Sequence, residues 1–135
     1  MFQVYEYLSQ FFSQQPVFDE DGFAHFLLEE IDGELDVDIT PITHWNDDLL
    51  KNKLLLDCDW ANTFALSWLQ DGKERLQVQH LHIREVKFFH ETYELTNGNH
   101  QDEAALLFYS DELPGRVLRV QLLPNLRVQL VIEFA

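Results

Sequence analysis

Alternating apolar and polar side chains near the end of the chain constrain the fold more than any other feature. From Leu118 to Leu122 every second residue is apolar, and the same alternation returns from Leu126 to Phe134. Successive side chains of a β-strand point to opposite faces, so a period of two is typical of strands that bury one face. Two such strands in succession predict a hairpin at the C-terminal end of the chain.

The register of this hairpin depends on the length of its loop. A two-residue loop at Pro124-Asn125 would place polar side chains opposite apolar ones. A three-residue loop, Pro124 to Leu126, pairs Leu122 with Val128 and keeps the apolar residues of both strands on one face. The sequence therefore predicts the three-residue loop and that pairing.

Two amphipathic helices are predicted before the β-rich part of the chain. The first covers Phe2 to Phe12, where apolar side chains recur at helical spacing. The second begins at Asp19 or Asp21, because either carboxylate can cap a helix N-terminus, and Gly33 stands where the C-terminal cap is expected. Its apolar side chains share one helical face and are expected to be buried: Phe23, Phe26, Leu27 and Ile31.

Strands are predicted through most of the remaining chain. From Glu34 to Thr40 the apolar residues again alternate with acidic ones. Further strand-like segments are residues 76–83, 84–95 and 104–109. Residues 59–70 fit either one helix or strands that turn at Asn62 and at Asp71-Gly72, and the strand interpretation is favoured slightly.

The expected fold class is therefore α+β. We expect two N-terminal helices packed on a mostly antiparallel β-sheet that ends in a C-terminal hairpin. A chain of 135 residues is long enough to bury a core without disulfides or metals, so a single domain, 1–135, is predicted.

Charge is distributed very unevenly along the chain. The sequence has 24 acidic residues and 9 lysines and arginines, for a net charge of −15. The first fifty residues contain twelve of the acids and neither lysine nor arginine, so they alone carry −12. Affinity for nucleic acid comes from cations that neutralise phosphates, and anionic lipid would repel the same surface. The charge therefore argues against nucleic-acid and membrane partners and favours a basic protein.

The leading hypothesis is a non-catalytic interaction module that docks on a basic partner. In its most concrete form it is an inhibitor of a nuclease toxin, since the chain resembles small, acidic bacterial immunity proteins in overall character. The expected partner-binding residues are acids near the N-terminus and one aromatic anchor: Asp19, Glu20, Asp21, Glu34, Asp36, Asp38 and Trp45. The alternative is a solvated acidic face that keeps an apolar domain in solution.

A second hypothesis is a small metal- or ligand-binding β protein. His80 and His82 would point to the same face of a regular strand, where both imidazoles could reach one ion. The pattern His80-x-His82-x-x-Glu85 resembles part of the first metal-binding motif of cupins. That family's second motif has another histidine near its end, whereas no histidine follows His100 in this chain. The resemblance therefore implies at most a partial metal site.

The remaining chemistry of the chain is sparse. Cys58 lies between two acidic residues, which oppose thiolate formation, so we expect a small buried apolar side chain. No nucleophile motif and no glycine-rich phosphate loop is present, so neither an enzyme nor a cofactor is predicted. With a single cysteine and an acid where a basic leader region would stand, the expected location is cytoplasmic. A third hypothesis is homo-oligomerisation through the C-terminal strand, Leu126 to Phe134.

Overall fold

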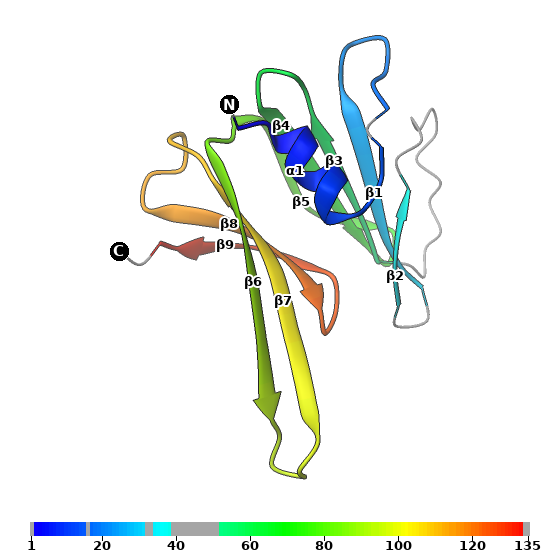
Figure 1. The fold of residues 1–135 in the computed structure, drawn as a ribbon, viewed down its shortest axis with the longest axis vertical. Coiled ribbons are helices and arrows are strands. Elements are labelled where there is room, and N and C mark those ends of the chain that lie inside the picture. The colour runs from blue at the N-terminus through cyan, green and yellow to red at the C-terminus, as the bar shows by residue number, and fades with distance from the viewer. Residues whose placement is uncertain (1, 16, 32–33, 39–51, 134–135) are drawn as a thin grey trace.

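Two antiparallel sheets and one short helix make up the described part of the chain, which comprises residues 2–15, 17–31, 34–38 and 52–133 of the computed structural model (Figure 1). Sheet A has the strand order β2-β1-β3-β4-β5, and sheet B has the order β6-β7-β8-β9. The helix is α1 (Val4–Phe11). The strands are β1 (Ala24–Ile31), β2 (Glu34–Asp38), β3 (Asn52–Cys58), β4 (Thr63–Gln70), β5 (Lys73–His82), β6 (Glu85–Glu94), β7 (His100–Tyr109), β8 (Arg116–Leu123) and β9 (Arg127–Ile132).

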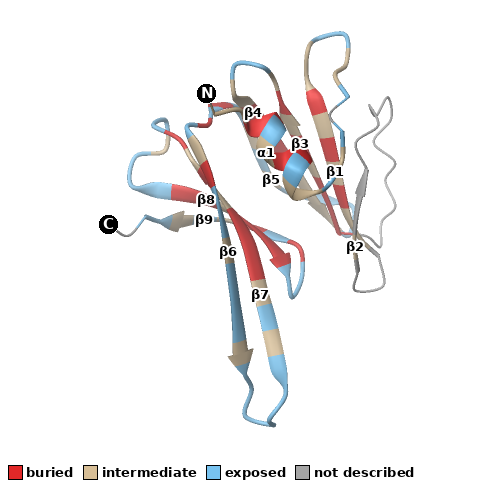
Figure 2. Ribbon diagram, in the orientation of Figure 1, coloured by how far each residue is buried: buried red, intermediate tan, exposed pale blue. Residues whose placement is uncertain are grey.

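The two sheets share one core where their apolar faces meet. Phe64 of β4 stacks on Phe108 of β7 with ring centroids 4.7 Å apart, and both side chains are fully buried. Such a pair contributes more than its buried area alone, because the ring edges and faces carry opposite partial charges. Away from this contact the hairpin of β6 and β7 extends beyond the core, and its tip is exposed (Figure 2).

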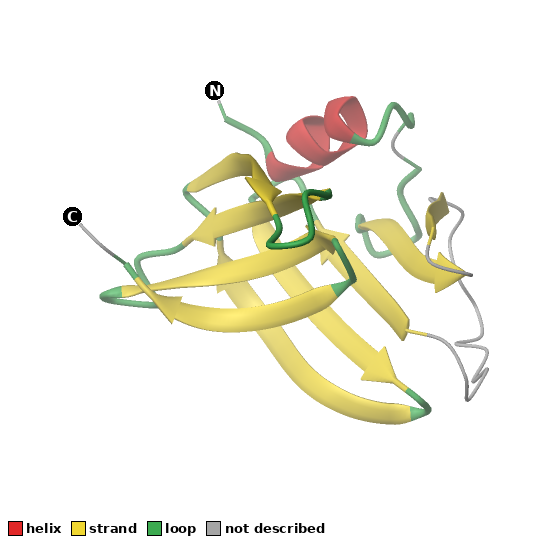
Figure 3. Ribbon diagram, turned by 90° about the horizontal axis from the view of Figure 1, so that it is seen from below, coloured by secondary structure: helices red, strands yellow, loops and turns green. Residues whose placement is uncertain are grey.

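Helix α1 lies beside the two sheets (Figure 3). Its apolar face is buried in the shared core through Val4 and Leu8. At the end of the helix, Phe11 packs against Phe88 of β6, and the ring of Phe12 lies 6.1 Å from that of Phe26 in β1. The helix therefore contributes to holding sheets A and B together.

The predicted α+β fold with two N-terminal helices is wrong, because the described part of the chain is mostly β and contains a single short helix. The first predicted helix is present, but the second is the strand β1. Its residues Ala24, Phe26 and Leu28 are buried at alternate positions, and the strand is paired on both sides, with β2 and with β3. The predicted helical stripe used a different subset of the apolar residues in this segment, Phe23, Phe26, Leu27 and Ile31, so the hydrogen-bonding neighbours decided between the two structures.

Two other predictions about the β-rich part are confirmed. Residues 59–70 contain a turn and the strand β4, with Asn62 at φ 63° and Asp71 at φ 53° in the turns that begin β4 and β5. The sheets are antiparallel, and β8 and β9 form the C-terminal hairpin. The predicted three-residue loop is wrong, because the last pair of the hairpin is Gln121 with Arg127 and residues 122–126 lie between them.

The predicted pairing within the C-terminal hairpin is shifted by two residues. Val128 lies opposite Val120 rather than Leu122, and Leu118 lies opposite Leu130. A shift of two residues leaves each side chain on its original face, so the burial argument could not distinguish the two registers. Only a shift of one residue would have exposed the apolar face.

Candidate interaction site

Two tight turns lie next to each other at one end of sheet A. The loop before β1 is closed by Asp19, whose carboxylate accepts hydrogen bonds of 2.9 Å from the backbone N–H groups of Asp21 and Phe23. The turn between β3 and β4 is closed in the same way by Asp59, with bonds of 2.9 Å from the N–H groups two and four residues later. Ala24 pairs with Cys58, which places the two turns at the same end.

An exposed tryptophan stands at the tip of the second turn. Trp60 keeps 57% of its surface exposed, yet its ring is held by two aromatic neighbours. Phe18 stacks on it with centroids 4.4 Å apart, and Tyr5 of α1 meets it edge-on at 4.7 Å. The rings of Tyr5 and Phe18 also contact each other, with centroids 5.1 Å apart, so three segments of the chain contribute to one aromatic surface.

The segments that carry Tyr5 and Phe18 also carry three exposed carboxylates. Glu6 accepts a hydrogen bond of 3.2 Å from the Tyr5 hydroxyl, and Glu20 and Asp21 follow Phe18 in the loop. In the part of the chain that the structure describes, no lysine or arginine forms an ion pair with these three acids. We call this surface the acidic aromatic end, defined by Tyr5, Glu6, Phe18, Glu20, Asp21 and Trp60.

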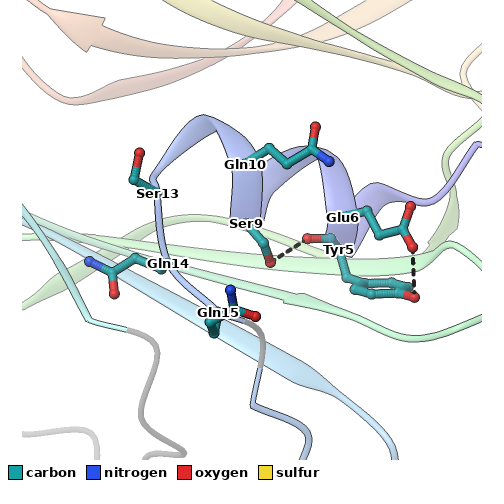
Figure 4. A pocket seen from close by; sticks show the side chains of 7 residues that line it. All are labelled: Tyr5, Glu6, Ser9, Gln10, Ser13, Gln14 and Gln15. Atoms are coloured by element: carbon teal, nitrogen blue, oxygen red, sulfur yellow. Dashed lines mark hydrogen bonds between the residues drawn. The ribbon is translucent and has the colours of Figure 1, made fainter.

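A polar cleft of about 620 Å³ adjoins the acidic aromatic end along α1 (Figure 4). It shares Tyr5 and Glu6 with that surface, and Glu6 supplies the only charge among its lining side chains. The other lining side chains carry hydroxyl or amide groups: Ser9, Gln10, Ser13, Gln14 and Gln15. Such groups both donate and accept hydrogen bonds, so the cleft suits a polar, extended chain better than an apolar ligand.

A charged histidine anchors the loop that carries Glu20 and Asp21. His25 donates from Nδ1 to Asp57 and from Nε2 to Asp19, the latter over 2.6 Å. The hydrogen bond to Asp57 is the main cause that raises the pKa of His25 to about 9, against the opposing effect of burial. An imidazolium that donates from both nitrogens has no lone pair to accept a proton, so His25 is suited to holding the loop rather than to general-base catalysis.

Asp19 takes part in this cluster, so its charge is largely satisfied inside the protein. Burial disfavours its ionisation, but the bonds from the Phe23 N–H and from His25 outweigh burial and lower the pKa of Asp19. Beside the cluster is a small pocket of about 200 Å³, which Thr63, Gln79 and His80 also line. The pocket lies on the face of sheet A where His25 pairs with Asp57 across the strands.

The two histidines of the metal hypothesis do not lie on a regular strand. Gln79 and His80 together oppose Ala65 in a β-bulge, and His80 has a φ of 57°. A bulge breaks the strict alternation of side chains, so the argument that placed His80 and His82 on one face does not hold. Among the described residues, no three histidine, cysteine, aspartate or glutamate side chains are arranged to hold a metal ion. Metal binding stays a prediction.

The predicted partner-binding residues fall into three groups. Asp19, Glu20 and Asp21 share one loop at the acidic aromatic end, although Asp19 is paired with His25. Glu34, Asp36 and Asp38 lie in β2, whose backbone pairs with β1 at the edge of sheet A. Trp45 lies outside the described residues.

Sequence reasoning missed Trp60 as an exposed aromatic side chain, whereas the expectation for Trp45 stays a prediction. A signal was present, since Asp59 can cap a turn and the next residue then stands at its tip. Cys58 is fully buried as expected, and burial, assisted by Asp57 and Asp59, raises the pKa of its thiol to about 12.

Comparison with known proteins identifies no relative: no protein-family model, curated protein or solved structure matches this chain. Within the described residues, no helix combines the length and the apolar character needed to cross a bilayer.

Proposed function

We propose that this protein is a non-catalytic interaction module whose acidic aromatic end docks on a basic protein partner. The observation that carries the proposal is Trp60, a large aromatic side chain that is more than half exposed and yet fixed by stacking on Phe18. Aromatic side chains of this kind act as anchors in protein interfaces, because they bury a large area with little loss of conformational entropy.

The chemistry around Trp60 supports a cationic partner. An arginine side chain can lie over the face of an indole ring and also reach a carboxylate, here that of Glu6, Glu20 or Asp21. Because the first fifty residues carry a charge of −12, the surface would also accelerate encounters with a basic protein. The most concrete form of the proposal is an immunity-type inhibitor that covers the basic active site of a nuclease toxin.

The proposal is tested with a fluorescently labelled oligo-arginine peptide, whose binding is measured by anisotropy at several salt concentrations. We expect binding that weakens steeply as salt rises. The Trp60→Ala variant should bind the peptide roughly fivefold more weakly, from the loss of about 1 kcal/mol of cation–π attraction. Phe88→Ala is a matched control, since Phe88 is 46% exposed and lies on β6.

A second pair of variants separates the local site from the total charge. Glu20→Gln with Asp21→Asn removes two charges at the acidic aromatic end, and Glu91→Gln with Glu94→Gln removes two exposed charges from β6. The first pair should weaken peptide binding clearly more than the second. Equal effects of both pairs, together with unchanged binding by Trp60→Ala, would contradict the proposed site.

The toxin-inhibitor form has its own test with a biological partner. A basic protein that copurifies with the wild-type chain should be lost with the Trp60→Ala variant and retained with Phe88→Ala. If that partner is a nuclease, the wild-type chain should suppress its activity in a salt-dependent way. A partner whose binding changes neither with salt concentration nor with the Trp60→Ala substitution would argue against this form of the proposal.

A further inference from the structure

Strand β9 forms an edge of sheet B and leaves two large apolar side chains exposed. Leu130 is 44% exposed and Ile132 is 64% exposed, whereas Val128 on the same face is buried. Leu130 and Ile132 therefore continue the buried apolar face of sheet B towards the end of the chain. Apolar side chains that extend a core face in this way are covered when a further strand is added.

The backbone of β9 is ready to accept such a strand. The N–H of Glu133 donates to the carbonyl of Gly115 over 3.0 Å, so the odd-numbered residues of β9 face β8. In an antiparallel pair the next residue along points its N–H and C=O to the other side. The backbone groups of Val128, Leu130 and Ile132 therefore face the edge of sheet B, where no strand of the described residues pairs with β9.

Two other sheet edges are protected in ways that β9 is not. Strand β5 has its register shifted at two places and begins with three exposed charged residues, Lys73, Glu74 and Arg75. Strand β6 is contacted by α1 through the packing of Phe11 on Phe88. Bulges, charges and covering segments are the usual means of preventing edge pairing. Strand β9 pairs with β8 without a shift and has neither proline nor lysine.

We propose that β9 pairs antiparallel with β9 of a second copy of this chain, which would join the two B sheets across a twofold axis. With Leu130 opposite Leu130 of the second copy, Val128 lies opposite Ile132, and the exposed apolar side chains cover one another. The three pairs would form about six hydrogen bonds, two for each pair of outward-facing residues.

Charge complementarity selects this register. With Leu130 on the twofold axis, Arg127 of each copy lies opposite Glu133 of the other, on the face away from the core. Directly opposed unlike charges stabilise a strand pair, and like charges destabilise it. Within one chain Glu133 is only weakly engaged, since its nearest cation is Arg84 at 3.9 Å. The register therefore gives both residues a close partner of opposite charge.

The high net charge of the chain does not oppose this contact strongly. The charge of −12 in the first fifty residues includes the acids of α1, β1 and β2, and β1 and β2 lie across the molecule from most of β9 (Figure 1). Strand β1 approaches β9 where Glu30 accepts a hydrogen bond of 2.7 Å from the N–H of Leu126, the residue before β9. Strands β8 and β9 carry three arginines, Arg116, Arg119 and Arg127, and no acid. Exposed charges separated by more than a Debye length of roughly 8–10 Å are largely screened at physiological salt.

Sedimentation equilibrium of the full chain over a wide concentration range tests the proposal. We expect a monomer–dimer equilibrium for the wild type. Arg127→Glu should weaken dimerisation about tenfold, because each of two attractive pairs becomes repulsive. The charge swap Arg127→Glu with Glu133→Arg should restore dimerisation, which a merely structural role of Arg127 would not allow.

Leu130→Lys and Leu123→Lys form a matched pair for the apolar contact, since Leu123 is also exposed, at 40%, but lies on β8. Only Leu130→Lys should abolish the dimer, and circular dichroism confirms that each variant is folded. In the wild type, hydrogen exchange at the amides of Val128, Leu130 and Ile132 should slow as the concentration rises. A wild type that stays monomeric, or a dimer indifferent to both Leu130→Lys and the charge reversal, would overturn the proposal.

Discussion

The cluster of His25, Asp19 and Asp57 predicts that the stability of this protein decreases as the pH rises from neutral to alkaline. The pKa of His25 is raised from 6.5 to about 9 in the folded protein, chiefly by the hydrogen bond to Asp57. The folded state therefore binds more protons than the unfolded state between these two pH values. The stabilisation is complete below pH 6.5 and is lost as the pH rises through 9.

The size of the effect follows from the same pKa values. Each pKa unit corresponds to about 1.36 kcal/mol, so a rise from 6.5 to about 9 sets an upper limit of about 3.4 kcal/mol. The side chain of His25 is 16% exposed and those of Asp19 and Asp57 are about a quarter exposed, so water screens part of the interaction. We therefore expect a loss of about 2 kcal/mol in the free energy of unfolding.

Urea denaturation followed by circular dichroism at a series of pH values from 6 to 9.5 measures this loss. The Asp57→Asn variant keeps the shape of the side chain but removes the charge, so its free energy of unfolding should be lower at pH 6 and should fall less steeply up to pH 9.5, since Asp19 still pairs with His25. NMR titration of the His25 ring in the wild type should give a midpoint near pH 9. A midpoint near 6.5, or parallel stability curves for the two proteins, would refute the reasoning.

Other variants test the hydrophobic core, the hydrogen bonds of Asn62 to the N-terminal segment, and the thiol of Cys58. Phe64→Ala should lower the free energy of unfolding by about 3–5 kcal/mol, because it removes a fully buried ring that stacks on Phe108. Asn62→Ala should cost about 2 kcal/mol in a urea melt, since the Asn62 side chain accepts from the Val4 N–H and donates to the Phe2 carbonyl. Cys58 should react with a thiol reagent at pH 8 only after denaturation, as its pKa is about 12 and it is buried. Metal analysis of the purified protein tests the alternative metal hypothesis, which predicts a stoichiometric metal that is lost in the His82→Ala variant and fails if the preparation is metal-free.

Predictions that depended on local periodicity succeeded where only one secondary structure fits the pattern. The hairpin of β8 and β9 and the turns at Asn62 and Asp71 follow from side-chain alternation and turn preferences within a few neighbouring residues. The segment Ala24–Ile31 failed because its apolar residues satisfy both a helical and a strand pattern. Its structure was decided by pairing with β3, which lies far away in the sequence.

The candidate site also combines features that the local sequence determines with features that only tertiary contacts produce. The acidic character of the N-terminal third is a property of composition, and it could be recognised without any structure. The aromatic surface around Trp60 could not, because Tyr5, Phe18 and Trp60 come from three separate segments and contact one another only after sheet A and α1 have formed. The cluster of His25, Asp19 and Asp57 likewise depends on tertiary structure, because Asp57 comes from the neighbouring strand β3.

The chain by itself therefore determined its β-rich ending, its turns and the sign of its charge, since each depends on residue type and on near neighbours. Tertiary structure decided that residues 24–31 form a strand, how β8 and β9 are registered, and which side chains meet at the acidic aromatic end. The physical reason is that strand pairing and core packing join residues that are distant in sequence. A local pattern that fits two structures takes the one in which those distant partners satisfy its backbone and cover its apolar face.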